Sequence, residues 1–275
     1  MTQTRKQELA HLANLIRQGV IEGIFHAKAG HPGGSLSSAD LMTYLYFEVM
    51  RVDPANPKWE GRDRFVLSKG HAAPVLYATL AHRGFFPAEE LVTLRKNGSR
   101  LQGHPSMKLC PGVDMSTGSL GQGISAAVGM ALGAKLDGTD LMTYTLLGDG
   151  ELQEGQVWEA AMFAAAKQLD NLVVIVDNNN LQIDGTIAEV NSPYPIAEKF
   201  VAFGFDVLEI DGHCFDALED AFAQINKNSK PTAIVMKTVK GRGVSFMENN
   251  VNWHGAAPNA EQYEQAMREL KGVAA

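Results

Sequence analysis

Two short polar segments, each directly after an apolar run, could hold a metal ion and a phosphate group. Gly148–Gly150, which reads Gly-Asp-Gly, follows Met142–Leu147, and the pair Asn178 and Asn179 follows Leu172–Asp177. Both apolar runs have the length and composition of buried strands. Because the carboxyl ends of parallel strands meet at one edge of a sheet, where ligands of α/β proteins bind, we expect the two segments to converge.

A carboxylate and a carboxamide at such an edge form an all-oxygen site that suits a hard divalent cation. Asp149, Asn179 and one backbone carbonyl just beyond would leave room for phosphate oxygens and water in the octahedral shell of Mg²⁺. Gly148 and Gly150 allow the backbone to approach a diphosphate, and a helix beginning near Glu154 would turn its positive end toward it. Turn chemistry explains either segment alone, but together they predict a metal and diphosphate site.

Three histidines stand in glycine-flanked turns, outside the apolar periodicity that marks a core residue. They are His31, His71 and His104. A single unassigned histidine is more often structural or merely exposed. Three in such turns favour a functional role.

The composition of the whole chain restricts its partners. With 275 residues, 45% of them hydrophobic, it can bury one large core, so we expect one domain. The net charge is -7 and the basic residues are scattered, which argues against nucleic acid as a partner. The apolar runs are too short to span a membrane, the start resembles no export signal, and Cys110 and Cys214 lie far apart. We expect a cytoplasmic protein without a membrane role.

The remaining pattern predicts an α/β fold, with a parallel sheet covered by helices on both faces. The first third is helical: one amphipathic helix from Thr4 to about Lys28, and a second, capped by Ser37 or Ser38, through Val49. A helix of small residues follows Gly121. Strands and helices then alternate, with strands at Met142–Leu147, Leu172–Asp177, Asp206–Ile210 and Thr232–Val239, and helices at Glu154–Gln168, Phe215–Asn226 and Glu261–Ala275.

Six motifs, in order along almost the whole chain, resemble transketolase. The pairing of Gly-Asp-Gly with Asn-Asn is the signature of thiamin-diphosphate enzymes, and the other motifs narrow the resemblance to this family. The six are Gly30–Gly34, Leu67–Ala72, Gly103–Pro105, Ser116–Gly123, Gly148–Gly155 and His254–Gly255.

The resemblance implies thiamin diphosphate and Mg²⁺, or Ca²⁺ or Mn²⁺, as cofactors, and it assigns roles residue by residue. The metal ligands would be Asp149, Asn179 and the carbonyl of Leu181. The cofactor-binding residues would be His71, Gly118, Ser119, Leu120, Asp149, Gly150, Glu154, Asn179, Ile183 and His254. The catalytic histidines would be His31, His71, His104 and His254, and Glu154 with Glu159 would belong to a carboxylate network between paired sites. Histidines suit ketol transfer, which moves protons on and off hydroxyls near neutral pH.

Full-length transketolases continue into a pyrimidine-binding domain and a C-terminal domain, whereas this sequence stops at Ala275. We therefore expect one diphosphate-binding domain over residues 1–275, and a separate subunit that carries the other domains, with two copies of each chain. A truncated piece of a longer protein would look identical. Ser119 stands where many relatives have proline, and the segment Met107–Pro111 is one residue longer than in some of them.

The implied activity is transfer of a two-carbon ketol unit from a ketose phosphate to an aldose phosphate. The alternatives are a subunit of another thiamin-diphosphate enzyme, similar to deoxyxylulose-phosphate synthase or a 2-oxo acid dehydrogenase, or a protein that binds the cofactor without catalysis. The presence of both His31 and His104 favours transketolase over each. Pentose-phosphate sugars are the default substrates, and a dedicated catabolic sugar is the second choice.

Overall fold

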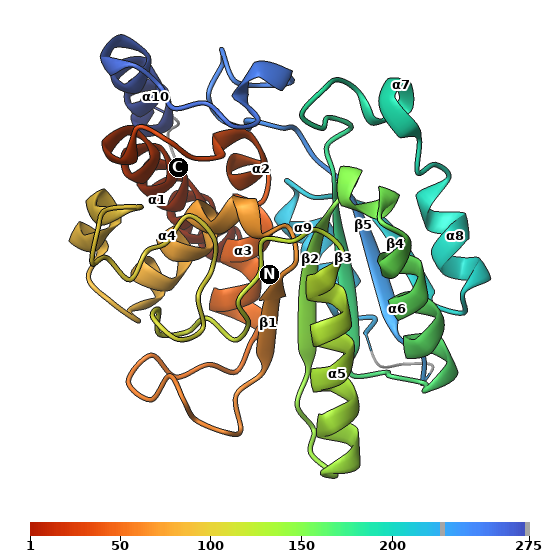
Figure 1. Ribbon diagram of the computed structural model, residues 1–275. Helices are drawn as coiled ribbons and strands as arrows, with labels where there is room; N and C mark the ends of the chain where they lie inside the picture. Colours follow the sequence, from red (N-terminus) through yellow and green to blue (C-terminus); the bar gives the residue numbers. More distant parts are fainter. Residues whose placement is uncertain (226–228, 273–275) are drawn as a thin grey trace.

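The computed structural model describes residues 1–225 and 229–272, built around a five-stranded parallel sheet. Its strand order is β1-β2-β3-β5-β4, and helices cover both faces (Figure 1). The expected fold class is confirmed. The strands are β1 (Arg64–Leu67), β2 (Thr143–Gly148), β3 (Leu172–Asn178), β4 (Asp206–Asp211) and β5 (Thr232–Lys237).

The helices divide between two hydrophobic clusters, one on each face of the sheet. The larger cluster includes residues of α1 (Gln3–Ala27), α3 (Ala39–Tyr44), α4 (Ala73–Arg83), α9 (Phe215–Phe222) and α10 (Ala260–Gly272). The smaller cluster includes residues of α5 (Gln122–Leu136), α6 (Gly155–Ala166) and α8 (Ile196–Ala202). Two short helices, α2 (Pro32–Leu36) and α7 (Ile187–Asn191), lie above the sheet in Figure 1.

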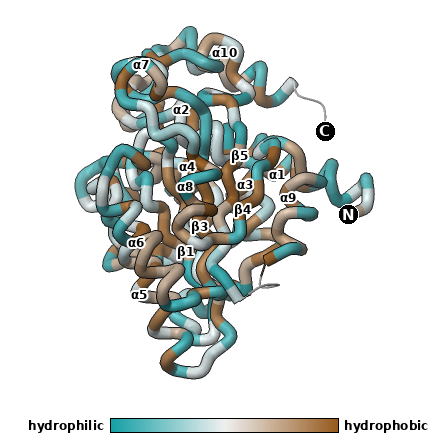
Figure 2. The backbone as a smooth tube through the Cα atoms, turned by 90° about the vertical axis from the view of Figure 1, so that its right-hand side faces the viewer, coloured by the Kyte–Doolittle hydropathy of each residue, from teal (hydrophilic) through white to brown (hydrophobic). Residues whose placement is uncertain are grey.

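Burial on both faces explains why the central strands are continuously apolar. In β3, Val173 and Ile175 belong to the larger cluster, whereas Val174 and Val176 belong to the smaller one. Successive side chains of a strand point to opposite faces, so a strand covered on both sides needs apolar residues throughout. Figure 2 shows the most hydrophobic stretches of the chain running through the sheet.

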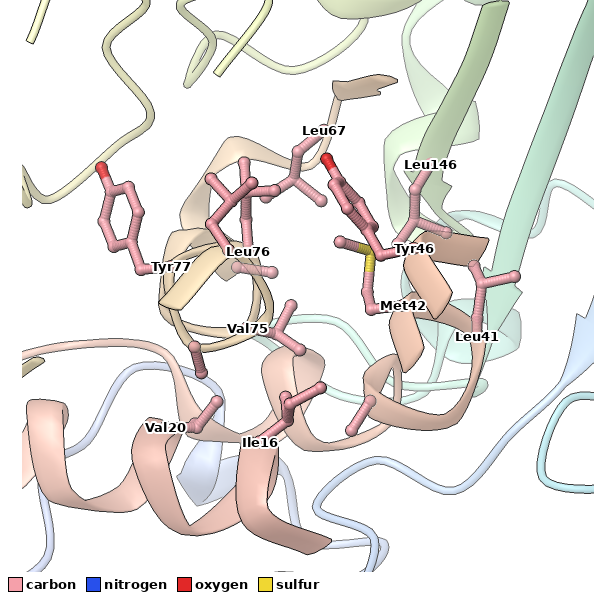
Figure 3. Close-up of a cluster of buried hydrophobic side chains, with 14 of the residues drawn as sticks. Ile16, Val20, Leu41, Met42, Tyr46, Leu67, Val75, Leu76, Tyr77 and Leu146 are labelled. Atoms are coloured by element: carbon pink, nitrogen blue, oxygen red, sulfur yellow. The ribbon is translucent and has the colours of Figure 1, made fainter. Parts of the chain in front are cut away.

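The helical first third packs directly on the sheet. Figure 3 shows Ile16 of α1 and Val75 of α4 in one cluster with Leu146 of β2. All three side chains are fully excluded from solvent. The turns that α1 and α4 adjoin are thereby fixed relative to the strand ends.

The structure corrects two expectations about local structure. The long first helix is confirmed, but the second is not one continuous helix, because a π-helical turn (Leu45–Val49) follows α3 and α2 precedes it. Ser38 stands at the N-cap of α3 as expected, but its hydroxyl donates to the Gly34 carbonyl and makes no capping hydrogen bond, and Ser37 donates to the Asp177 carboxylate. The expected helix ends at 226 and 273–275 lie outside the described residues.

Several elements were not predicted, namely β1, α4, α7 and α8. Within the described ranges, no helix combines the length and apolarity needed to cross a membrane.

Candidate functional site

The carboxyl ends of β2, β3 and β5 converge as the strand pattern predicts. The Asp149 amide donates to the carbonyl of Asp177 over 3.3 Å, and the Asp149 carboxylate accepts the amide of Asn180 at 2.5 Å. From β5, the hydroxyl of Thr238 donates to the Asp177 carboxylate. Asp149 of the Gly-Asp-Gly segment is thus bonded to the residues on either side of the Asn-Asn pair.

A cavity of about 320 Å³ opens at this junction and collects most of the predicted cofactor residues. Ser119 is exposed and lies between two lining residues without lining the cavity itself. A wider groove of about 1080 Å³ continues beyond Asn179 along the ends of β4 and β5, away from the predicted histidines. The predicted residues that line the smaller cavity are His71, Gly118, Leu120, Asp149, Gly150, Glu154, Asn179, Leu181, Ile183 and His254.

The three predicted metal ligands, Asp149, Asn179 and Leu181, all line the cavity. Asp149 is buried, and its burial, together with the neighbouring Asp177 carboxylate, raises its pKa to about 7. A carboxylate in such surroundings is stabilised by a cation beside it. Among the described residues, no three His, Cys, Asp or Glu side chains gather to hold a metal. The donor set therefore fits a hard cation that takes its remaining ligands from a diphosphate.

Three of the four predicted catalytic histidines lie ring against ring. The centroids of His31 and His71 are 5.3 Å apart, and His254 lies 5.2 Å from His71 and 5.6 Å from His31. Burial, reinforced by nearby cations, lowers the pKa of His31 to about 4 and that of His254 to about 3. Burial likewise holds the pKa of His71 well below its usual value. The cluster is therefore neutral at pH 7.

The fourth histidine, His104, approaches the site from another turn. A Cβ added to Gly118 would lie 2.9 Å from the His104 ring, so the two turns are in contact. The Tyr77 hydroxyl donates to the carbonyls of Gln102 and His104, each over 3.0 Å, which ties this turn to α4. Burial followed by the Arg95 charge lowers the pKa of His104.

Two lysines of the cavity were not predicted. The Lys240 ammonium lies 2.8 Å from the Leu181 carbonyl and 3.0 Å from Nδ1 of His254, and burial lowers its pKa to about 8. Lys69 is buried and bonded to Asp177 at 2.5 Å. Lys240 follows β5 in the sequence. If the end of β5 had been included with those of β2 and β3, the same reasoning would have predicted Lys240 as a site residue. The signal for Lys69 was its position within the motif Leu67–Ala72, where it is the one basic residue besides His71.

One buried carboxylate holds several turns of the cavity together. Glu151 accepts the Ser68 hydroxyl at 2.5 Å and the amides of Gly121 and Gly148 at 2.9 and 3.1 Å. A Cβ on Gly70 would lie 2.6 Å from the Gly118 nitrogen, so only glycine permits this close approach of two turns. The helix α6 begins at Gly155, after a 3₁₀ turn over Gly150–Gln153.

The two glutamates assigned to an interface network are exposed. Glu154 lies at the start of α6 and Glu159 one turn further along it. Glu154 also lines the cavity, whereas Glu159 does not. Of the two, Glu154 is thus positioned to contact a molecule in the cavity, whereas Glu159 lies on the surface of α6.

Comparison with known proteins identifies relatives along nearly the full sequence. A family model described as the transketolase thiamine diphosphate binding domain matches residues 9–274. The chain is 47% identical to the 6-deoxy-6-sulfo-D-fructose transketolase subunit SqwG of Clostridium sp. (strain MSTE9), over 96% of both chains. It is 48% identical to an apulose-4-phosphate transketolase subunit of Phocaeicola vulgatus, over 92% of this chain and 90% of that protein. The crystal structure of Campylobacter jejuni transketolase superposes with a TM-score of 0.91 and 36% identity, and covers 96% of this chain but 43% of its own.

Proposed function

This chain belongs to the transketolase family, and from that premise we propose that it is the N-terminal, diphosphate-binding subunit of a split transketolase. The proposed enzyme transfers a two-carbon ketol unit from a ketose phosphate to an aldose phosphate. The observation that carries the proposal is the cavity in which Asp149, Asn179 and Leu181 lie beside the histidine cluster. A protein that only bound the cofactor would not need His31 and His104.

The cofactors proposed are thiamin diphosphate and Mg²⁺. The oxygen atoms of Asp149, Asn179 and Leu181 would hold the metal, and His71, Gly150 and His254 would contact the diphosphate. Gly118, Leu120 and Ile183 would lie along the thiamin. When bound, thiamin diphosphate supplies the carbanion chemistry of ketol transfer, and the protein supplies orientation and proton movement.

The histidines are proposed to move protons on the sugar hydroxyls. A neutral imidazole has one nitrogen that donates and one that accepts, so each ring can give or take a proton. Nδ1 of His31 is buried and has no hydrogen-bond partner within the described ranges. His104, on the opposite turn, would contact the same sugar.

The proposed partner is a chain that carries the pyrimidine-binding and C-terminal domains, with two copies of each subunit. The outer faces of α5 and α6 support a docking surface: Leu136, Met162 and Phe163 are 78%, 59% and 43% exposed. A Cβ added to Gly129 or Gly133 of α5 would meet nothing within 4 Å, so these positions of the helix are open. Large exposed apolar patches are typical of protein interfaces. Glu154, at the N-cap of α6, and Glu159, within that helix, are exposed as well.

A dedicated sugar is a second candidate for the substrate. The relatives of matching length are named for 6-deoxy-6-sulfo-D-fructose and apulose-4-phosphate, and not for pentose-phosphate sugars in general. With either kind of substrate, the proposed reaction is a ketol transfer. The free thiols of Cys110 and Cys214 support a cytoplasmic location.

The decisive experiment is a coupled ketol-transfer assay on the purified chain, alone and with the candidate partner added. We expect no turnover from the chain alone and robust turnover from the mixture with thiamin diphosphate and Mg²⁺. Turnover by the lone chain, with contaminating transketolase excluded, would refute the split-enzyme proposal.

A further inference from the structure

A fully buried ion pair lies directly beneath the proposed metal site. The Asp177 carboxylate accepts the Lys69 ammonium at 2.5 Å, the Ser37 hydroxyl at 2.7 Å and the carboxamide nitrogen of Asn179 at 2.9 Å. The Thr238 hydroxyl donates to its other oxygen. Neither the lysine nor the aspartate reaches solvent, with exposed fractions of 1% and 0%.

The ammonium of Lys69 is also fully engaged. Its other two contacts are the Gly34 carbonyl at 2.8 Å and the Ser38 hydroxyl at 2.7 Å. The pair therefore joins the ends of β1 and β3 to the turn that carries α2. A buried ion pair is a poor source of stability, because hydrophobic residues of similar volume often serve as well or better. Its value to this chain should lie elsewhere.

The contact between Asp177 and Asn179 indicates a role for the ion pair other than stability. A carboxamide has one side that donates hydrogen bonds and one that accepts them, and only the oxygen can bind Mg²⁺. An ionised Asp177 only accepts, so the nitrogen of Asn179 must face it. The Leu181 amide donates to the oxygen of Asn179 over 3.1 Å, so nitrogen and oxygen of the carboxamide have different partners and the oxygen does not face Asp177.

We propose that Asp177, anchored by Lys69, is a positioning residue that fixes the Asn179 carboxamide with its oxygen toward the metal. This inference rests on the proposed function, since it takes Asn179 as a metal ligand. Partners that orient metal ligands typically contribute about 10- to 100-fold to metal affinity. Removing the acceptor at residue 177 should therefore cost a similar factor.

Two double variants separate orientation from general structure. Lys69→Met with Asp177→Asn removes both charges but keeps an acceptor oxygen for Asn179. Lys69→Met with Asp177→Leu removes both charges and the acceptor, and replaces the pair by apolar side chains of similar size. Each is assembled with the partner chain, and thiamin diphosphate binding is titrated calorimetrically at increasing Mg²⁺ concentration. Thermal unfolding without cofactor reports the state of the fold.

We expect the asparagine pair to stay within a few-fold of the parent in Mg²⁺ affinity and the leucine pair to lose about 10- to 100-fold. Adding Asn179→Asp to the leucine pair should restore most of the loss, because a carboxylate offers an oxygen in either orientation. Equal affinities of the two double variants, or no rescue, would overturn the inference while the proposed function stands. A parent assembly that binds thiamin diphosphate without any divalent metal would instead remove the metal assignment, and the inference with it.

Discussion

Two carboxylates at neighbouring strand ends have opposite environments. Burial alone raises the pKa of a carboxyl group, but at Asp177 the Lys69 ammonium and the hydroxyl donors outweigh it and lower the pKa. Asp149 accepts the backbone amides of Gly150 and Asn180, which do not outweigh its burial, and its pKa rises to about 7. Of the two, Asp149 is the one whose charge remains to be neutralised by a ligand.

Replacing Asp149 should separate cofactor binding from stability. Asp149→Asn is expected to weaken metal-dependent binding of thiamin diphosphate by roughly 10- to 100-fold or more, since it removes the charged member of the donor set. It should change the unfolding temperature of the chain without metal only slightly, because removal of a buried charge offsets the loss of one acceptor for the amides of Gly150 and Asn180. Calorimetric titration and thermal unfolding test the two halves. Asp184→Asn, at an exposed carboxylate, serves as the control and should change neither.

The neutral histidine cluster should make the free chain sensitive to acid. His31 and His254 have pKa values of about 4 and 3 in the folded chain, against about 6.5 for an unfolded histidine. Between these values the unfolded chain binds more protons. The stabilisation is therefore fully present above pH 6.5 and is lost as the pH falls toward 4.

Each histidine should contribute up to about 1.4 kcal/mol per pH unit, reduced where its ring is partly exposed. The buried carboxyl groups of Asp114, Asp149 and Glu151, whose pKa values are raised by burial, have the opposite sign, so the contribution of the histidines is read from a comparison with a variant that lacks them. Urea unfolding of the cofactor-free chain at pH 7.5, 6.5 and 5.5 measures the slope. His31→Gln combined with His254→Gln should flatten it. The same slope in the parent and in the double variant would contradict the neutral cluster.

At the scale of elements, the strength of the sequence signal follows the packing. The runs that form β2 and β3 are buried, and their mainly apolar, β-branched and aromatic residues predicted them as strands, although Thr143 and Thr145 interrupt the apolar sequence of β2. The strand β1 has only four residues and begins with Arg64. Its three apolar residues are too few to predict a strand. In α4 every residue from Ala73 to Ala81 is buried, so the polar face that reveals a helix is missing.

The site followed the same logic. Asp149 and Asn179 could be predicted because each ends a recognisable strand. The pairing of Lys69 with Asp177 could not, since it depends on a contact between residues 108 positions apart. The histidine assignments came from the family resemblance, and the structure adds their neutrality, which depends on burial that no single turn reveals.

Two glycines of α5 should respond oppositely to alanine. A Cβ at Gly123 would lie 2.6 Å from the Cα of Ser68, whereas one at Gly133 would meet nothing within 4 Å. Gly123→Ala should destabilise the chain by about 1–3 kcal/mol, because a backbone must move. Gly133→Ala should stabilise it by about 0.5–1 kcal/mol through reduced freedom of the unfolded chain. Urea unfolding of both variants decides, and equal effects would show that α5 does not pack on the end of β1 as described.

At the scale of the whole molecule, mutations on the face formed by α5 and α6 should affect assembly with the partner without affecting the fold of the chain. Met162→Glu should leave the fold of the chain intact, because the side chain is 59% exposed. It should abolish association with the proposed partner, since an ionised group would be buried there unpaired. Val201→Glu on α8 is the control at 58% exposure. Sedimentation of the mixed chains measures association, and normal assembly of Met162→Glu would place the interface elsewhere.

The Glu151 carboxylate links the mobility of turns that are far apart in the sequence. The amides of Gly121 and Gly148 both donate to this carboxylate. Either amide could exchange its hydrogen for deuterium separately only if its bond to Glu151 broke while the other bond remained. Burial makes that costly, so the two amides should become exposed in the same opening and show similar free energies of protection. The turn that would lie along the thiamin and the strand end that would hold the diphosphate then open as a single unit.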